Sequence, residues 1–166
     1  MKRSALLLLV LAGAGALADE LNDFESDGCS SFPEGTSKQK ELWHSCCVVH
    51  DLAYWMGGSA DERTEADLAL RECVYQVGEP TIAELMLAGV RVGGTPWLPT
   101  RFRWAYGWSW GRGYAEFSDA DKTQFADKIK DAKKVVASEE SADEPGDASA
   151  IEPSDDQTVD TEAIEK

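Results

Sequence analysis

The chain has 166 residues, of which 31 are acidic and 16 are basic, and its formal net charge at pH 7 is −15. A chain of this length has room for one domain with extensions. Residues 19–137 hold twenty acidic and thirteen basic residues without a basic stripe. This charge balance argues against a nucleic-acid partner.

Residues 1–18 have the pattern of a secretory signal peptide. Lys2 and Arg3 form a basic head, residues 5–11 are an apolar run, and the segment ends with Ala16-Leu17-Ala18. The apolar run is shorter than the ~20 residues that a membrane-spanning helix needs. We therefore expect cleavage after Ala18 and a secreted or periplasmic protein, with a domain over residues 19–137.

A first helix is expected over about residues 42–56. Four residues recur along it at helical spacing and share one face: Trp43, Cys47, His50 and Tyr54. Gly57 and Gly58 end the pattern.

A second helix is expected from just after Ser59 or Asp61 to about Val77, closed by Gly78 and Pro80. Its predicted stripe consists of Ala66, Leu70, Cys73 and Val77. The short link between the two helices favours an antiparallel pair.

The four cysteines are expected to form disulfides, because exported proteins meet oxidising compartments. Four cysteines allow three pairings. If Cys46 bonds Cys73, His50 and Asp67 come to lie side by side across the helix pair. A carboxylate beside an imidazole fixes its tautomer, so the other ring nitrogen can act as a general base. Asp51, rotated by about 100° around the helix, would be free to hold a hard cation.

The run CCVVHDLAY at residues 46–54 resembles the active-site helix of the secreted phospholipase A2 family. Asp67, six residues before Cys73, resembles the family's second active-site helix, and the similarity covers about residues 27–77. It implies a divergent, bacterial-type member that hydrolyses the sn-2 ester of glycerophospholipids with calcium. The substrate would be presented by a phospholipid membrane surface or by micelles.

The resemblance also implies a role for each matching residue. His50 would activate water, Asp67 would orient His50, and Tyr54 would hydrogen-bond Asp67. Asp51 would bind calcium through both carboxylate oxygens.

The remaining calcium ligands implied by the family are main-chain carbonyls from the loop DGCSSFPEGT at residues 27–36. Counting from Cys29, these are Gly28, Ser30 and Phe32, and the family pattern implies a Cys29–Cys47 disulfide. The family loop has glycine at positions where this chain has Ser30 and Phe32.

Residues 85–115 contain no acidic residue and four arginines: Arg91, Arg101, Arg103 and Arg112. Aromatic residues occupy every second position from Phe102 to Trp110, which predicts a short extended segment with one aromatic face. That face either closes the core or meets lipid headgroups. The segment from Arg91 to Tyr114 could also contact a protein partner.

A last helix is expected over about residues 119–136, with Ser118 as its N-cap and Asp121 three residues on. Residues 138–166 hold eleven acidic residues and one basic residue, Lys166. Such a composition predicts a disordered acidic tail.

The sequence thus predicts a mainly α, disulfide-linked fold with an antiparallel two-helix core, an N-terminal calcium loop, a short extended aromatic segment and a C-terminal helix. Calcium-dependent phospholipid hydrolysis is the preferred function. A catalytically silent lipid- or protein-binding module on the same scaffold is the alternative, and an exported toxin or inhibitor is a third. A zinc site at Cys46, Cys47 and His50 is disfavoured because adjacent cysteines lack the usual ligand spacing. His44 stands outside the pattern, and a structural role is expected for it.

Overall fold

The computed structural model describes residues 20–142, which form five helices and, within that range, no extended strand. The helices are joined by loops, and the fold contains two disulfides, Cys29–Cys47 and Cys46–Cys73. The expected mainly helical, disulfide-linked fold is confirmed at this level. The predicted signal peptide and its cleavage site lie outside the described residues.

The expected helix pair is present as α1 (His44–Met56) and α2 (Ala60–Gln76). Gly57 ends α1 with a φ of 72°, in the left-handed region that glycine tolerates. Ser59 caps α2 by accepting from the Glu62 N–H, and the Ser59 N–H donates to the Glu62 carboxylate. These signals fix the sharp reversal between the helices.

The buried stripe of α2 differs from the predicted one. Arg63, Asp67, Leu70 and Val74 are buried, whereas Val77 is 37% exposed. The prediction used the spacing of apolar residues alone. It therefore placed Val77 on the buried stripe, and it gave no reason to bury an arginine and an aspartate. The buried charges satisfy each other and their neighbours, as described below.

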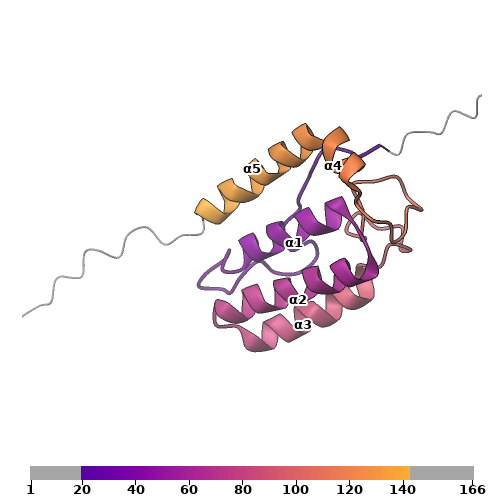
Figure 1. Ribbon diagram of the computed structural model, residues 1–166. Helices are drawn as coiled ribbons and strands as arrows, with labels where there is room; N and C mark the ends of the chain where they lie inside the picture. The colour runs from indigo at the N-terminus through magenta and orange to yellow at the C-terminus, as the bar shows by residue number, and fades with distance from the viewer. Residues whose placement is uncertain (1–19, 143–166) are drawn as a thin grey trace, which may run out of the picture.

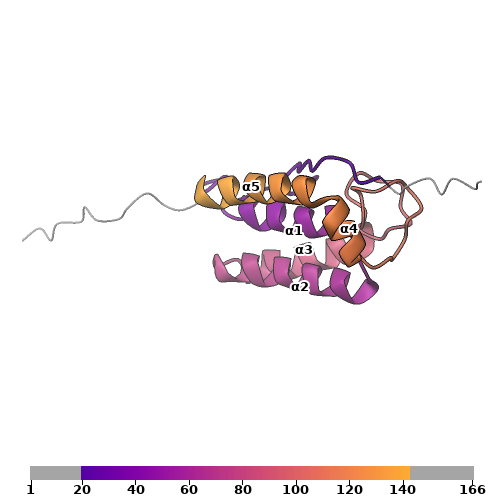
Figure 2. The same ribbon diagram turned by 45° about the horizontal axis from the view of Figure 1, so that its top comes forward.

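A helix that the sequence analysis did not predict, α3 (Pro80–Gly93), packs against α2. The sequence pattern uses Pro80 only as the end of the second helix, but Pro80 occupies the first turn of α3. The N–H groups of a first turn have no partner within the helix, so the N–H that proline lacks is not missed there. Ala83 and Met86 bury its inner face. Figures 1 and 2 show α1, α2 and α3 running alongside one another.

The predicted extended aromatic segment is wrong. Residues 101–108 form turns, with Ala105 at a φ of 61°, and only an isolated bridge between Leu21 and Trp108 is present. The indole N–H groups of Trp104 and Trp108 donate to the carbonyls of Gly58 (2.9 Å) and Met56 (2.7 Å). The segment therefore closes the core over the C-terminal end of α1. The last carbonyl groups of a helix have no partner within the helix, and the indoles supply hydrogen-bond donors there.

The expected last helix is divided into α4 (Asp119–Gln124) and α5 (Ala126–Ala142). The Ser118 cap with Asp121 is confirmed. Between the two helices, Phe125 packs edge-on against Trp108, with ring centroids 5.3 Å apart. Figure 2 shows α5 lying along α1, on the side away from α2 and α3.

The first residues of the segment predicted to be a disordered tail are helical. Residues 138–142 belong to α5, and the rest of the tail lies outside the described residues. Within residues 20–142, no helix combines the length and the apolar character that crossing a membrane requires.

The Cys46–Cys73 bond links α1 to α2 across 27 residues of chain. Replacing both cysteines by alanine should lower the free energy of unfolding by about 2–5 kcal/mol, because the unfolded chain gains freedom. Urea unfolding followed by tryptophan fluorescence would measure the change. An unchanged free energy would show that helix packing alone holds α1 against α2.

Candidate active site

A cavity of about 260 Å³ lies where α1, α3 and the loop around Cys29 meet. Six of the seven residues expected to act in catalysis or calcium binding line it: Gly28, Ser30, Phe32, His50, Asp51 and Tyr54. Leu85, Met86 and Val90 of α3 form an apolar part of its wall. The helix that the sequence did not predict therefore completes the site.

His50 and Asp67 form the pair expected from the helix geometry. His50 Nε2 lies 3.0 Å from Asp67 Oδ1, and the two residues are 8% and 0% exposed. Because a carboxylate only accepts, this contact places the imidazole proton on Nε2 and the lone pair on Nδ1. Among the described residues, no donor or acceptor contacts Nδ1, and His50 lines the cavity.

Asp67 accepts hydrogen bonds from two further residues. The Tyr54 hydroxyl donates to Oδ1 at 2.7 Å, and Arg91 Nη1 donates to Oδ2 at 2.9 Å. Burial raises the pKa of Asp67, but the hydrogen bonds from His50, Tyr54 and Arg91 outweigh it and hold the pKa below its usual value. Asp67 is therefore ionised at neutral pH.

Arg63 is a buried member of the site that the sequence analysis missed. It donates to the Tyr54 hydroxyl (3.2 Å), the Tyr114 hydroxyl (2.9 Å) and the carbonyls of Val90 and Arg91 (2.8 and 2.9 Å), and its Nε lies 3.8 Å from Asp67 Oδ2. The i,i+4 spacing of Arg63 and Asp67 on α2 was the available signal. For Arg91, no sequence spacing indicated a contact with Asp67, because Arg91 lies on α3, which the sequence did not predict.

Tyr54 lies between the charged side chains of Asp67 and Arg63 and hydrogen-bonds both. Burial is the main cause that raises the pKa of the Tyr54 hydroxyl above its usual value, and the hydrogen bond to Asp67 raises it further. The phenol stays protonated and donates to Asp67 while it accepts from Arg63. Its hydroxyl also touches the backbone of α3, since a Cβ at Gly94 would lie 2.5 Å from it.

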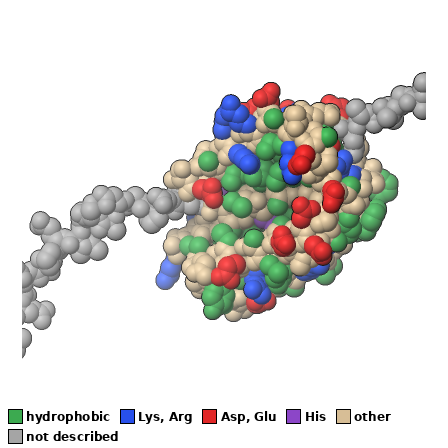
Figure 3. Space-filling view, viewed as in Figure 1, with side chains coloured by type: hydrophobic (Ala, Val, Ile, Leu, Met, Phe, Trp, Pro, Cys, Tyr) green, Lys and Arg blue, Asp and Glu red, His purple; other side chains and the backbone are tan. Residues whose placement is uncertain are grey.

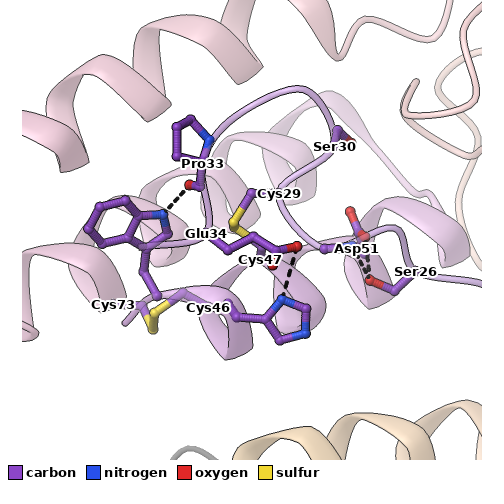
Figure 4. The surroundings of a disulfide bond; sticks show 12 residues. Ser26, Cys29, Ser30, Pro33, Glu34, Cys46, Cys47, Asp51 and Cys73 are labelled. Carbon is purple, nitrogen blue, oxygen red and sulfur yellow. Dashed lines mark hydrogen bonds and ion pairs between the residues drawn. A yellow bond between two sulfur atoms is a disulfide. The ribbon is translucent and has the colours of Figure 1, made fainter. Parts of the chain in front are cut away.

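Asp51 is 8% exposed and has a different environment from Asp67. Ser26 Oγ donates to Asp51 Oδ2 at 2.7 Å, and the Gly28 N–H donates to Ser26 Oγ at 3.1 Å (Figure 4). Burial raises the pKa of Asp51 to about 7; the hydrogen bond from Ser26 lowers it, and the charge of Asp27 raises it. Asp51 is thus a buried acid beside another acid.

The loop that faces Asp51 is held to α1 by the Cys29–Cys47 disulfide (Figure 4). Gly28 and Ser30 adopt positive φ values of 66° and 57°, which bend the backbone around Cys29. A carboxylate without a cationic hydrogen-bond partner and a strongly curved main chain suit a hard cation with oxygen ligands.

Side chains alone do not form a metal site in the part of the chain that the structure describes: no group of three His, Cys, Asp or Glu residues is placed to hold a metal. A cation at Asp51 would therefore need main-chain oxygens, for which Gly28, Ser30 and Phe32 are the candidates. Zinc at Cys46, Cys47 and His50 is excluded, because both cysteines are in disulfides.

His44 does not line the cavity. Its Nδ1 lies 3.2 Å from Glu34 Oε1 and its Nε2 lies 3.6 Å from Glu139 Oε2. These contacts link the Cys29 loop to α5, which agrees with the structural role expected for His44.

The chain is a small helical, disulfide-linked protein with a buried His–Asp pair at an apolar cavity. Comparison with protein-family models, with characterised proteins and with solved structures gives no match in any of the three.

The lowered pKa of Asp67 predicts an acid dependence of stability. A carboxyl whose pKa is lower in the folded state than its unfolded value of about 3.9 stabilises the fold above that value, and this contribution is lost as the pH falls through the folded pKa. Asp67→Asn should therefore be less stable at neutral pH and should show a shallower loss of stability in acid. Urea unfolding between pH 2 and 7 measures both, with Glu65→Gln, an exposed acid on α2, as control. Parallel curves for the native protein and Asp67→Asn would contradict the assignment.

Proposed function

We propose that the protein hydrolyses the sn-2 acyl ester of glycerophospholipids with calcium, as the secreted phospholipase A2 family does. The observation that carries the proposal is the 3.0 Å contact between His50 Nε2 and a fully buried, ionised Asp67, with the imidazole at the wall of an apolar cavity. The sequence resemblance at residues 46–54 and 67–73 supports the same chemistry.

In the proposed reaction, His50 Nδ1 takes a proton from a water molecule in the cavity as the water oxygen attacks the ester carbonyl carbon. Asp67 stabilises the imidazolium that forms. When the C–O bond to the glycerol breaks, His50 returns the proton to the departing alkoxide. The products are a free fatty acid and a lysophospholipid, and the imidazole is neutral again.

Tyr54, Arg63 and Arg91 act through Asp67 as positioning residues. Tyr54 and Arg91 donate hydrogen bonds to the two Asp67 oxygens, and the Arg63 guanidinium lies 3.8 Å from Oδ2, so the imidazole is held in one orientation before the reaction begins. When held by Asp51 with the carbonyls of Gly28, Ser30 and Phe32, calcium would supply the positive charge that an ester oxyanion requires.

The cavity walls suit an acyl chain. Leu70, Leu85, Met86 and Val90 are apolar, and Leu85 is 56% exposed at the surface. Exposed apolar side chains occur nearby in the sequence, with Val92 at 76%, Trp97 at 61% and Trp110 at 66%. Figure 3 shows hydrophobic side chains gathered at the edge of the molecule where the 94–118 segment loops out in Figure 1. We infer that this edge approaches a phospholipid membrane surface or a micelle.

The arginines of this segment contribute less to such a surface than the sequence suggested. Arg103 is buried and donates to the carbonyls of Trp104, Ala105 and Trp108. Arg112 stacks 3.6 Å from the centroid of the Trp108 ring. Arg91 is bound to Asp67. Arg101 is the exposed arginine available for a lipid phosphate.

The alternative proposal is a lipid- or protein-binding module without turnover. Its support is the hydrogen bond from Ser26, which engages one of the two Asp51 oxygens that a calcium ion would use. Export to the periplasm or to the medium fits either proposal, because both disulfides need an oxidising compartment.

His50→Gln should reduce fatty-acid release by at least about 10²–10⁴-fold, because the base is lost. The measurement is release from mixed phospholipid vesicles in calcium and in chelator. His44→Gln, outside the cavity, is the matched control and should keep native rates. Native rates in His50→Gln would overturn the hydrolytic mechanism.

Calcium should raise the melting temperature of the native protein, since a ligand that binds only the folded state stabilises it by mass action. Asp51→Asn should abolish that shift and the calcium-dependent activity, whereas Asp61→Asn on the exposed start of α2 should keep both. A calcium-induced shift of native size in Asp51→Asn would place the ion elsewhere.

A further inference from the structure

A second cavity, of about 150 Å³, also has Asp51 in its lining. Its walls are formed by Glu25, Ser26, Asp27, Asp51, Arg101, Phe102 and Tyr106. Asp51 and Phe102 line both cavities, so the second cavity adjoins the first. The proposed hydrolysis assigns no role to Glu25, Asp27 or Tyr106, and it gives Arg101 no partner beyond a lipid phosphate.

Opposite charges line this second cavity without neutralising each other. Arg101 shares the lining with three carboxylates, yet within the described residues no ion pair of 4.0 Å or less joins it to any of them. Glu25, Asp27 and Arg101 are exposed, so their charges are available to a ligand from solvent. A lining that keeps a cation and several anions apart is complementary to a ligand that carries both charges.

Two aromatic rings complete the lining. The hydroxyl of Tyr106 donates to the main-chain carbonyl of Glu25 at 2.7 Å, which holds the ring against residues 25–27. Phe102, 37% exposed, lines both cavities. Aromatic faces beside carboxylates attract organic ammonium groups, because ring quadrupoles and negative charges act in the same direction.

We propose that the second cavity binds a zwitterionic headgroup, with the phosphate at Arg101 and the ammonium among Glu25, Asp27 and the two aromatic rings. This inference rests on the proposed function and specifies its substrate class as phospholipids with ethanolamine or choline headgroups. The acyl chain occupies the apolar cavity, and the headgroup occupies the charged one.

The same lining disfavours anionic headgroups. A glycerol headgroup has no ammonium to offset Glu25 and Asp27, so its phosphate meets the attraction of Arg101 and the repulsion of the acids together. Discrimination between headgroups therefore depends on Glu25 and Asp27, whereas binding of any phosphate depends on Arg101.

The first test uses free headgroup compounds and needs no hydrolysis. Phosphoethanolamine, phosphocholine and glycerol phosphate are titrated into the full chain, and amide NMR shifts report binding. We expect the two zwitterions to bind more tightly than glycerol phosphate. Glu25→Gln should reduce that preference about three- to tenfold, and Arg101→Gln should weaken all three compounds alike. Glu72→Gln on α2 and Arg71→Gln are charge-matched controls outside the cavity and should behave as the native protein does.

The second test distinguishes lipid-borne headgroups from free ones. Binding to, and fatty-acid release from, phosphatidylethanolamine and phosphatidylglycerol vesicles are compared in the same variants. A preference for phosphatidylethanolamine that falls in Glu25→Gln supports the proposal even if the free compounds bind weakly.

Three outcomes would overturn either the headgroup cavity or the proposed hydrolysis. Equal headgroup preference in the native protein and Glu25→Gln, with both ligand sources, overturns the headgroup cavity. Displacement of phosphoethanolamine by calcium in simple competition in Asp51→Asn, which lacks the proposed calcium ligand, overturns it as well, because Glu25 and Asp27 would then form a cation site. Headgroup-selective binding without hydrolysis of any vesicle leaves the headgroup cavity standing and overturns the proposed hydrolysis.

Discussion

Asp67 keeps a negative charge at a position with no exposed surface, and the three central helices are arranged around that charge. Its oxygens are satisfied by His50 and Tyr54 from α1 and by Arg91 from α3, while Arg63 approaches along α2 itself. An unpaired buried charge is far more costly than a paired one, so each partner depends on the others being in place. The site residues are therefore also the residues that fix how α1, α2 and α3 pack.

The disulfides and the tryptophans hold the frame in which this charge is buried. Cys46–Cys73 links α1 to α2, while the indoles of Trp104 and Trp108 cover the opposite end of α1 by binding its carbonyls. Both ends of α1 are thus restrained by interactions that do not involve the cavity. His50 and Asp51 occupy neighbouring positions of the same helix but have different partners: His50 contacts Asp67, and Asp51 accepts a hydrogen bond from Ser26.

That division matches the requirements of an amphiphilic ligand. On the His50 side, the cavity is mainly apolar and ends at a base held by Asp67; on the Asp51 side, carboxylates and Arg101 surround a smaller space. Burying Asp51 beside Asp27 is unfavourable in isolation, and in our proposal a cation relieves it. The proposed chemistry thus uses His50 and Asp51 at the first cavity, and the proposed headgroup recognition uses the second cavity, which shares Asp51 with the first.

The sequence by itself determined what local patterns can encode. Ser59 and Ser118 marked helix starts, Gly57 marked a helix end, and the spacing of Cys46, His50, Asp67 and Cys73 indicated the pair that meets across α1 and α2. The helix-end signals depend on neighbouring residues, whereas the His50–Asp67 pair, 17 residues apart, was indicated by the short link between the helices together with the Cys46–Cys73 bond. The tertiary structure decided the rest: Arg63 binds groups 27, 28 and 51 residues away, α3 begins at a proline that equally well ends a helix, and the alternating tryptophans lie in turns. Burial of a charge or a ring depends on partners that only the folded chain brings together, so no local pattern could predict it.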